Sequence, residues 1–573
     1  MPYDASPRYP LSAGAVESGY APLADEIARL RPARLAIDGP AALDWDVFVD
    51  RLQAALRERG LASSALDVRD RMLPWSEIVR RTERPILSAD PVFAAPESVA
   101  FEDLIADRDV GPPAAHRSPP RGTADGGVTV VYGPGSAAFG HDLLWYADLP
   151  KRLALEACEA GRARNLGQPH GAVGTSRRLL FVDWPIEDTH RRAQTGRWQR
   201  YVDASDGERP RSVGGDVLRH SLRALTSRPF RTLPAFLAEP WGGRWARDVL
   251  GVREGGPHAA APGPNAGLGY ELVAPESGIL LGERDTCEVA LDVLVGSEPR
   301  ALLGRHVVER FGASLPIRLD YLDTVDGGDL SVHCHPMDGY MREVFGLPYT
   351  QDETYYVMTT RPGARIFLGL REGADVAAFR DDAERSHNEA RELDVDRFIA
   401  IHPAVAHQIY LVPAGTPHGS GEGNVVLEIS ATPYLYSLRF YDWLRAGLDG
   451  RPRPVQLEHA FANLDRERLA SSLVPTPRLL RRASGVEEWI VGEHPDLFFT
   501  VRRLHLGAGA AAEDTTRDRF HVLNVVKGEG VVVHTAAAEH RLAYAETLLV
   551  PAGAGGYRVE ARDPAMVVKA FVA

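Results

Sequence analysis

Lysine and cysteine are both scarce in this chain of 573 residues. The lysines are Lys151, Lys527 and Lys569. Arginine therefore carries nearly all of the positive charge, and a reaction step that needs a deprotonatable amine finds none between residues 152 and 526. The cysteines are Cys158, Cys287 and Cys334. Because they lie far apart, no disulfide framework is predicted, and a reducing compartment is expected.

Long apolar runs and an excess of basic residues are also missing. No apolar run approaches the roughly 20 residues that a membrane-spanning helix needs. The first residues lack the basic-then-apolar pattern of a secretory signal. The net charge of −13 and the pI near 5.8 argue against a general binder of nucleic acids or anionic membranes. We therefore expect a cytoplasmic protein whose partners include neither nucleic acid nor membrane.

The first 228 residues show a mixed helix and strand pattern. Residues 1–22, which contain several Pro and Gly, look like a loose leader. Buried-strand runs, followed by Gly-containing turns and amphipathic stretches, predict one α/β region over 23–110 and a second over 128–228. Pro and Gly between about 111 and 127 predict the linker that joins them.

Two strand-to-helix turns in these regions are of the kind that can cradle phosphate. Gly39-Pro40 and Gly133-Pro134-Gly135 could offer backbone N–H groups to such a ligand. Neither turn is followed by the Gly-Lys-Ser/Thr of a working phosphate loop. Residues 128–228 therefore resemble a degenerate nucleotide-kinase-like domain only loosely, and turns that serve the fold alone are the favoured interpretation.

From about residue 267 the pattern becomes all-β. Short apolar runs alternate with Gly, Pro and Asp, as in a β-barrel. A helical insert is predicted at about 373–397. The segment VPAGTPH at 412–418 recurs in weakened form as VPAGAGG at 550–556, where Gly556 stands in place of His418. The sequence thus predicts two related barrels, and only the first keeps its histidine.

Three histidines and one glutamate form the most specific pattern in the chain. His333 and His335 are two apart in an apolar run, so on a strand they face the same side. Glu353 follows eighteen residues after His335, and His418 ends a Pro-x-Gly turn about eighty residues on. Three imidazoles and one carboxylate suit a divalent metal with an open position for water or substrate. The alternative is a barrel that buries these polar side chains without a role, which is costly.

Together with their neighbours, these residues resemble the class I mannose-6-phosphate isomerases of the bacterial type, which belong to the cupins. Five segments carry the resemblance: 233–244, 311–336, 353–357 (ETYYV), 413–429 and 437–443 (SLRFYDW). The match spans about 229–573, and a long subset of that family carries an extra N-terminal half.

The resemblance implies a multidomain fold in which the N-terminal α/β region precedes an all-β double cupin, two jelly-roll barrels with the small helical insert. The metal-binding isomerase domain would cover 229–480. A C-terminal cupin without metal ligands would cover 481–573, and we expect it to serve packing or assembly.

The resemblance also implies an activity: interconversion of mannose 6-phosphate and fructose 6-phosphate by a metal-dependent aldose–ketose isomerase, through a cis-enediol. The expected ligands of one Zn²⁺ per chain, or of another divalent metal, are His333, His335, Glu353 and His418. Arg439 would stabilise the enediolate or hold the phosphate; its alternative is an ion pair with Asp442. Glu271 and Gln351 are expected to contact the substrate, and a surface strand position is the alternative for Glu271.

Two positions depart from the family pattern. The usual first ligand is a Gln in Gln-x-His-Pro, where this chain has His333. The family often has Lys two residues before the metal-binding Glu, where this chain has Gln351. A mechanism that uses that lysine is therefore unavailable, and the base stays unassigned between a metal-bound water or hydroxide and a nearby carboxylate.

Two other functions stay open at this point. A cupin metal dioxygenase would use similar ligands, but tightly spaced cupin oxygenases place the Glu a few residues after His-x-His, and the interval of eighteen favours the isomerase. A non-catalytic sugar-phosphate sensor would keep the metal and lose the base, and the missing lysine favours it. The fold alone does not separate these functions. A homo-oligomer is compatible with each of them.

Overall fold

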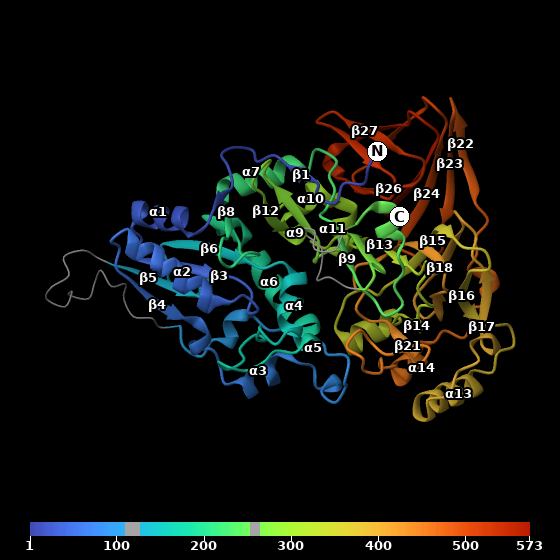
Figure 1. Ribbon diagram of the computed structural model, residues 1–573, viewed down its shortest axis with the longest axis horizontal. Coiled ribbons are helices and arrows are strands. Elements are labelled where there is room, and N and C mark those ends of the chain that lie inside the picture. Colours follow the sequence, from blue (N-terminus) through green and yellow to red (C-terminus); the bar gives the residue numbers. More distant parts are fainter. Residues whose placement is uncertain (109–126, 253–263) are drawn as a thin grey trace. The chain divides into compact units, whose positions relative to one another are not determined.

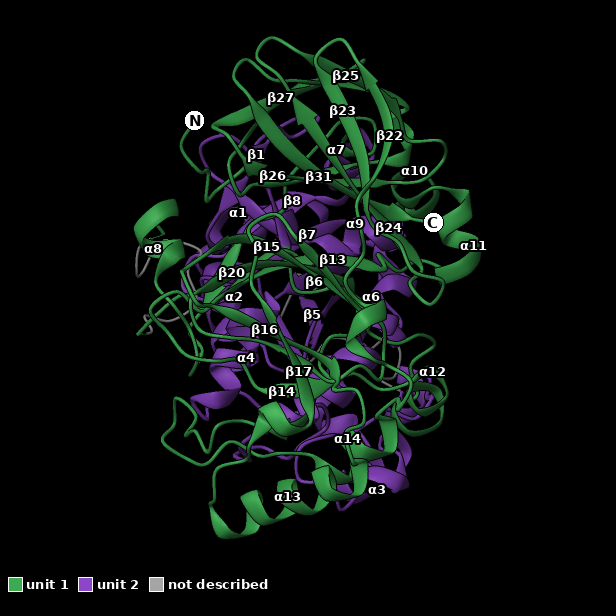
Figure 2. Ribbon diagram, turned by 90° about the vertical axis from the view of Figure 1, so that its right-hand side faces the viewer, with its two compact units in different colours: residues 1–7, 225–277, 298–573 green, residues 8–224, 278–297 purple. Residues whose placement is uncertain are grey.

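The computed structural model describes residues 1–108, 127–252 and 264–573, so nearly all of the predicted linker lies outside the described residues. The chain forms two compact units, each rich in β-sheet (Figure 2). Unit 1 comprises 1–7, 225–277 and 298–573, and unit 2 comprises 8–224 and 278–297. The expected multidomain organisation is confirmed.

The units are not continuous in sequence. Residues 278–297 belong to unit 2, although unit 1 precedes and follows them. The reason is strand pairing: β11 (Gly278–Leu281) pairs in parallel with β1 (Arg8–Tyr9) and antiparallel with β12 (Cys287–Ala290). Backbone hydrogen bonds between segments so distant in sequence leave no local signal in composition or periodicity.

Unit 2 is built on a seven-stranded mixed sheet in the order β2-β8-β7-β6-β3-β5-β4. Five neighbouring strands run parallel: β3 (Arg34–Asp38), β4 (Ser63–Asp67), β5 (Val128–Tyr132), β6 (Leu143–Asp148) and β7 (Arg200–Asp203). The antiparallel strands β8 (Arg211–Gly214) and β2 (Glu17–Ser18) extend one edge. Parallel strands need crossover connections, and helices supply most of them here.

Helices α1 (Tyr20–Leu30) and α2 (Trp45–Glu58) pack on this sheet (Figure 1). The side chain of Asp44 accepts a hydrogen bond from the backbone N–H of Val47 at 3.1 Å and so caps the start of α2. The apolar stripe of α2 meets strand residues such as Ile37 and Val130 in one buried core.

The Gly133-Pro134-Gly135 turn is tied to the end of β3. The carboxylate of Asp38 accepts hydrogen bonds from the N–H groups of Gly135 at 3.1 Å and Ala137 at 2.9 Å. It also accepts from Gly39 at 2.8 Å and lies 3.0 Å from the ring of His190. The donors that would cradle phosphate already serve a buried carboxylate, which favours a structural role for this turn.

Unit 1 contains two pairs of sheets, and the first pair carries the histidines. A six-stranded sheet, β18-β15-β20-β13-β10-β9, and a five-stranded sheet, β17-β16-β19-β14-β21, share one apolar core. Tyr355 and Val426 reach it from the first sheet, Ile366 and Leu368 from the second.

The first sheet's strands are β9 (Ala235–Leu237), β10 (Leu268–Leu272), β13 (Ile317–Asp323), β15 (Glu353–Thr360), β18 (Ile409–Val412) and β20 (Asn424–Ala431). The second sheet's strands are β14 (Val332–Cys334), β16 (Arg365–Leu370), β17 (Ile399–Pro403), β19 (His418–Ser420) and β21 (Leu438–Tyr441). Helix α13 (Val376–Glu389) lies within the range of the predicted helical insert.

The second pair of sheets closes the chain. Its six-stranded sheet has the order β22-β23-β24-β31-β26-β29, and its four-stranded sheet the order β25-β30-β27-β28. Residues of both sheets, such as Leu523 and Val567 on one and Val533 and Val559 on the other, share a core. The first sheet's strands are β22 (Arg478–Ala483), β23 (Val486–Gly492), β24 (Phe499–Leu506), β26 (His521–Lys527), β29 (Thr547–Val550) and β31 (Ala565–Val572). The second sheet's strands are β25 (Ala511–Thr515), β27 (Gly530–Thr535), β28 (Glu539–Ala543) and β30 (Gly556–Glu560), and Gly556 is exposed.

Among the helices in the described ranges, none combines the length and apolar character needed to cross a bilayer.

One of the few lysines holds the second pair of sheets together. Lys569 on β31 is 1% exposed, and its Nζ lies 2.9 Å from Oε1 of Glu488 and contacts Asp514. Arg502 reaches the same Glu488 oxygen at 3.1 Å. A cation at this point compensates carboxylates that would otherwise be buried without a counter-charge.

We predict that Lys569→Met lowers the free energy of unfolding by about 1.5–3 kcal/mol, because half-buried Asp514 loses its ion pair while Glu488 keeps Arg481 and Arg502. Urea titration followed by intrinsic fluorescence measures the loss. Lys527→Met is the matched control, since Lys527 is exposed, and it should change stability by less than about 0.5 kcal/mol. Equal effects of the two substitutions would contradict the structural role given to Lys569.

Candidate metal centre

Three histidines converge inside the first pair of sheets. Strands β14 and β19 are antiparallel neighbours, and their pairing places His333 opposite His418. His335 follows β14 on the same side, two residues on. The ring centroids lie 4.3 Å apart for His333 and His418, and 5.3 and 5.2 Å from His335 to His333 and His418 respectively. One nitrogen from each ring lies within 4.8 Å of the others, so the three can hold a metal ion.

Backbone carbonyl groups fix the orientation of these rings. Nδ1 of His333 donates to the carbonyl oxygen of Ser331 at 2.9 Å, and Nδ1 of His418 donates to that of Thr416 at 2.9 Å. Nδ1 of His335 lies 3.4 Å from the carbonyl oxygen of Tyr436. A proton on Nδ1 leaves the lone pair of Nε2 free, and this is the arrangement that metal-binding histidines usually show.

The carboxylate of Glu353 completes the cluster. Glu353 is the first residue of β15 and is fully buried. Its Oε2 lies 3.0 Å from Nε2 of His335, and its Oε1 lies 2.7 Å from Nε2 of His418. Because the Nδ1 atoms carry the ring protons, each contact brings two lone pairs together, and these contacts are favourable only with a cation or an extra proton between them. The donor set therefore fits a divalent metal.

The electrostatics keep the cluster ready for a cation. Burial, reinforced by His418 and His335, holds the pKa of His333 well below its usual range, so this ring stays neutral. Burial alone would raise the pKa of Glu353, but His335 and His418 outweigh it and hold that pKa well below the usual range. Burial alone would lower the pKa of His418, but Glu353 outweighs it and raises that pKa, so the metal-free cluster favours a proton shared between these two groups. A divalent metal would take the place of that proton when it binds.

A cavity of about 140 Å³ opens beside the cluster. His333, His335 and Glu353 form one part of its wall. Arginine and acidic side chains from several strands and loops line the rest, namely Glu239, Arg318, Asp320, Glu428, Arg439 and Arg453. Tyr270, Tyr355 and Tyr434 are among the aromatic residues of its wall.

Arg439 lies beside the histidines, as expected for a site residue. It sits on β21, which pairs with β14 and places Arg439 opposite His333. Its Nε atom is buried and lies 4.0 Å from Oδ2 of Asp442, so the alternative ion pair exists but is long. Burial, together with the neighbouring Arg453, lowers the pKa of Arg439 to about 10, and the side chain remains charged near neutral pH.

Sequence reasoning missed the other members of this arginine cluster. Nη1 of Arg453 lies 2.8 Å from Asp442 and its Nη2 lies 3.8 Å from Glu239, while Arg445 lies 3.4 Å from Asp442. Three guanidinium groups thus share two carboxylates, which leaves an excess of positive charge. Arg453 lies in the loop Arg451-Pro452-Arg453-Pro454, and its sequence offered only this repetition of Arg-Pro as a signal.

At another side of the cavity, Gln351 connects the metal-binding glutamate to a buried ion pair. Its Nε2 donates to Oε2 of Glu353 at 2.8 Å and lies 3.4 Å from Oε1 of Glu428. Glu428 in turn pairs with Arg318. Gln351 therefore lines the cavity, where its prediction placed it, and it also holds Glu353 in position.

Glu271 lies elsewhere and is not among the residues that line this cavity. It is buried, not on the surface: Oε2 accepts from the N–H of Thr547 at 2.8 Å, and Oε1 accepts from the hydroxyl of Tyr3. Arg231 lies 3.6 Å from it and also pairs with Glu546 at 2.7 Å. Its partners come from the chain start and from the second pair of sheets, so the geometry favours a structural role. Its neighbour Tyr270 faces the cavity instead, as strand alternation requires.

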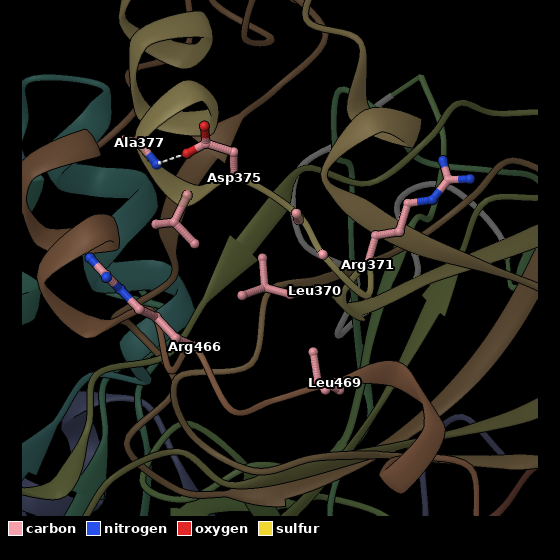
Figure 3. Close-up of a pocket in the computed structure, with 9 residues that line it drawn as sticks. Leu370, Arg371, Asp375, Ala377, Arg466 and Leu469 are labelled. Carbon is pink, nitrogen blue, oxygen red and sulfur yellow. Dashed lines mark hydrogen bonds between the residues drawn. The ribbon is translucent and has the colours of Figure 1, made fainter.

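A larger pocket of about 390 Å³ lies at the start of α13 (Figure 3). Arg371 and Arg466 line it, but the carboxylate of Asp375 accepts the N–H groups of Ala377 at 2.9 Å and Ala378 at 3.1 Å. The helix end is therefore already capped by the chain's own carboxylate. Nothing among the described residues directs a metal or a reaction there.

We predict that His335→Ala and His418→Ala each lose the bound metal, because each removes one of three nitrogens that converge on the same point. Elemental analysis of purified protein should give less than a tenth of the wild-type metal content. His387→Ala is the control, since His387 lies exposed on α13, and it should keep the metal. Full metal content in both cluster variants would contradict the ligand assignment.

Comparisons with known proteins give one domain-family match and several similar proteins. Residues 19–227 match a domain family of unknown function, DUF8485. The mannose-6-phosphate isomerase of Streptococcus mutans is 26% identical over 319 residues, which cover 54% of this chain and 88% of the relative. A probable mannose-6-phosphate isomerase of Bacillus subtilis is 24% identical over 334 residues, 57% of this chain and 94% of the relative.

The crystal structure of a mannose 6-phosphate isomerase from Bacillus subtilis aligns with 60% of this chain and 99% of its own, at 19% identity and a TM-score of 0.48. The two sequence relatives confirm the expected resemblance to mannose-6-phosphate isomerases. The chain is similar to these proteins and is longer than they are.

Proposed function

We propose that this protein is a metal-dependent aldose–ketose isomerase that interconverts mannose 6-phosphate and fructose 6-phosphate through a cis-enediol. One observation carries the proposal: a single cavity is lined both by the His333–His335–Glu353 cluster and by Arg439 and Arg453. A sugar phosphate needs both features, a cation for its reacting oxygens and guanidinium groups for its phosphate. The similarity to curated isomerases supports the same reaction.

The proposed metal ligands are the three histidines and Glu353, with one Zn²⁺ per chain. Three nitrogens and one oxygen are a common donor set for zinc, and other divalent metals accept it as well. A divalent metal, when bound, polarises the sugar oxygens at C1 and C2 and stabilises the negative charge of the enediolate. The carbonyl groups behind His333 and His418 keep these rings directed at that position.

Arg439 and Arg453 are proposed to bind the phosphate. Their shared carboxylates, Asp442 and Glu239, hold the guanidinium groups in place without neutralising all of the charge. A guanidinium group binds phosphate through two parallel N–H donors, which fixes the orientation of the sugar as well as its affinity.

The two pairs of sheets in unit 1 support the double-cupin proposal. The first pair, within 229–480, holds the proposed metal ligands. The second pair begins at Arg478, three residues before the proposed boundary, and has exposed Gly556 where the sequence repeat places His418. We propose that the second cupin has no metal-dependent activity and serves packing or assembly.

An assay of the zinc-loaded protein with mannose 6-phosphate tests the function. We expect fructose 6-phosphate to form, activity to disappear with a chelator, and activity to return with Zn²⁺. Oxygen uptake with Fe²⁺ would favour a dioxygenase instead. Binding of the sugar phosphate without conversion, at full zinc content, would favour the sensor.

We predict that Arg439→Gln raises the KM for mannose 6-phosphate about 10–150-fold, because a lost hydrogen bond to a charged group costs about 1.5–3 kcal/mol. Steady-state kinetics measures the change, and metal content should stay at the wild-type value. Arg371→Gln is the control, since Arg371 lies at the separate pocket of Figure 3. An unchanged KM in Arg439→Gln would remove this residue from the phosphate site.

A further inference from the structure

Asp320 is a buried carboxyl group that the cavity leaves without hydrogen-bond donors. It lies on β13, is 0% exposed, and lines the same cavity as His333 and Glu353. Among the described residues, none donates a hydrogen bond to either of its carboxyl oxygens. Its nearest charged neighbour is Arg318, whose Nη2 lies 3.4 Å from Oδ1.

The neighbouring carboxylate, Glu428, has the hydrogen bonds expected of a buried acid with a structural role. Glu428 accepts hydrogen bonds from Arg318, from Oγ of Ser430 at 2.9 Å and from Nε2 of Gln351 at 3.4 Å. The Nε atom of Arg318 also donates to Ser430 at 2.6 Å, so this guanidinium group is directed at Glu428. Asp320 receives only the weaker, unaligned contact.

Asp323 lies on the same strand as Asp320 and, unlike it, accepts hydrogen bonds. It is equally buried, but its oxygens accept from the N–H groups of Val325 at 3.0 Å and Ala246 at 3.2 Å. Burying a carboxyl group without donors costs free energy that a purely structural position would avoid. The exception at Asp320 therefore points to a partner that enters the cavity.

The charges lining this part of the cavity balance when a dication is present. Burial, together with Glu428 and Glu353, raises the pKa of Asp320 well above its usual range. Arg318 and a bound dication would offset the charges of Glu353, Glu428 and Asp320 and so would favour the ionised form.

The other acidic groups of this part of the cavity are engaged: Glu428 is held by three donors, and Glu239 lies 3.8 Å from Arg453. Burial raises the pKa of the Tyr355 hydroxyl well above its usual range, which makes it a poor base.

We propose that Asp320 carries the proton between C2 and C1 of the sugar, an inference that rests on the proposed isomerase function. In the forward direction, a carboxylate oxygen of Asp320 takes the proton from C2. The C–H electron pair forms the C1=C2 bond, and the carbonyl pair moves onto O1 to give the cis-enediolate.

In the second step, the O2 hydroxyl proton passes to O1 within the enediolate. The C2=O2 bond then forms, and the C1=C2 pair takes the proton from Asp320 at C1. Asp320 returns to its ionised form, and neither an oxidant nor a further acid is required. Because one group carries the proton, both transfers occur on the same face of the enediolate.

The test compares Asp320→Asn with Asp323→Asn in the zinc-loaded, full-length protein. The two substitutions are identical in chemistry, lie on the same strand and affect equally buried groups, but Asp323 does not line the cavity. We expect Asp320→Asn to lower kcat about 10²–10⁴-fold, the usual contribution of a general acid or base. Zinc content and the Kd for fructose 6-phosphate, measured by calorimetry, should stay within threefold of wild type. Asp323→Asn should lower stability while it keeps most of the activity.

Chemical rescue gives a second, independent measurement. Asp320→Ala removes the carboxyl group and leaves space for a small acid. Added formate should therefore raise the residual rate of this variant at least tenfold, and acetate should raise it less. In D2O, the wild-type protein should place deuterium at C2 of mannose 6-phosphate, and Asp320→Asn should not.

Three outcomes would overturn the inference: wild-type kcat in Asp320→Asn, loss of zinc or of fructose 6-phosphate binding in that variant, or absence of rescue by formate in a folded Asp320→Ala. If wild-type protein with Zn²⁺ shows no conversion, the proposed function itself fails. That result is distinct, because it is seen before any substitution is made.

Discussion

The site depends on one constraint, the antiparallel pairing of β14 with β19 that sets His333 opposite His418. Strand pairing brings the two rings together, and carbonyl groups of their own segments, at Ser331 and Thr416, hold each ring by Nδ1. Because the backbone itself supplies these contacts, the direction of both Nε2 lone pairs follows from the fold. Glu353, at the start of a strand in the facing sheet, then needs only to reach across the core.

The cost of burying so many ionisable groups explains the rest of the cavity. Three of the carboxylates in and beside the cavity have close partners: Glu428 has Arg318, Asp442 has Arg453, and Glu353 has the histidines. Gln351 joins Glu353 to Glu428 and carries no charge of its own. These groups hold one another in place, and charges fixed in this way would stabilise the proposed enediolate without reorganisation.

The sequence predicted the metal cluster because its signal is local. Two histidines on alternate strand positions and a Pro-x-Gly-x-x-His turn are readable without a structure. The arginine cluster and Asp320 had no such signal, because Arg453 reaches the site from a loop and Asp320 looks like any polar residue on a strand. Glu271 shows the opposite case: strand alternation turns it away from the cavity, and its partners Tyr3 and Thr547 are hundreds of residues away in sequence. The assignment of 278–297 to unit 2 was unpredictable for the same reason.

The absence of lysine from most of the chain is related to the proposed role of Asp320. A chain with no lysine between residues 152 and 526 must move protons in this cavity with carboxylates, histidines or solvent. The histidines are the proposed metal ligands, and Glu428 is paired with Arg318. A group that transfers a proton must be free to gain and lose it, so strong fixed donors would impair it. Asp320 is buried beside the cluster, contacts Arg318 at 3.4 Å and accepts no hydrogen bond from the described residues, so it meets that requirement. The absence of hydrogen-bond donors is then a property of the proposed reaction rather than a defect of the fold.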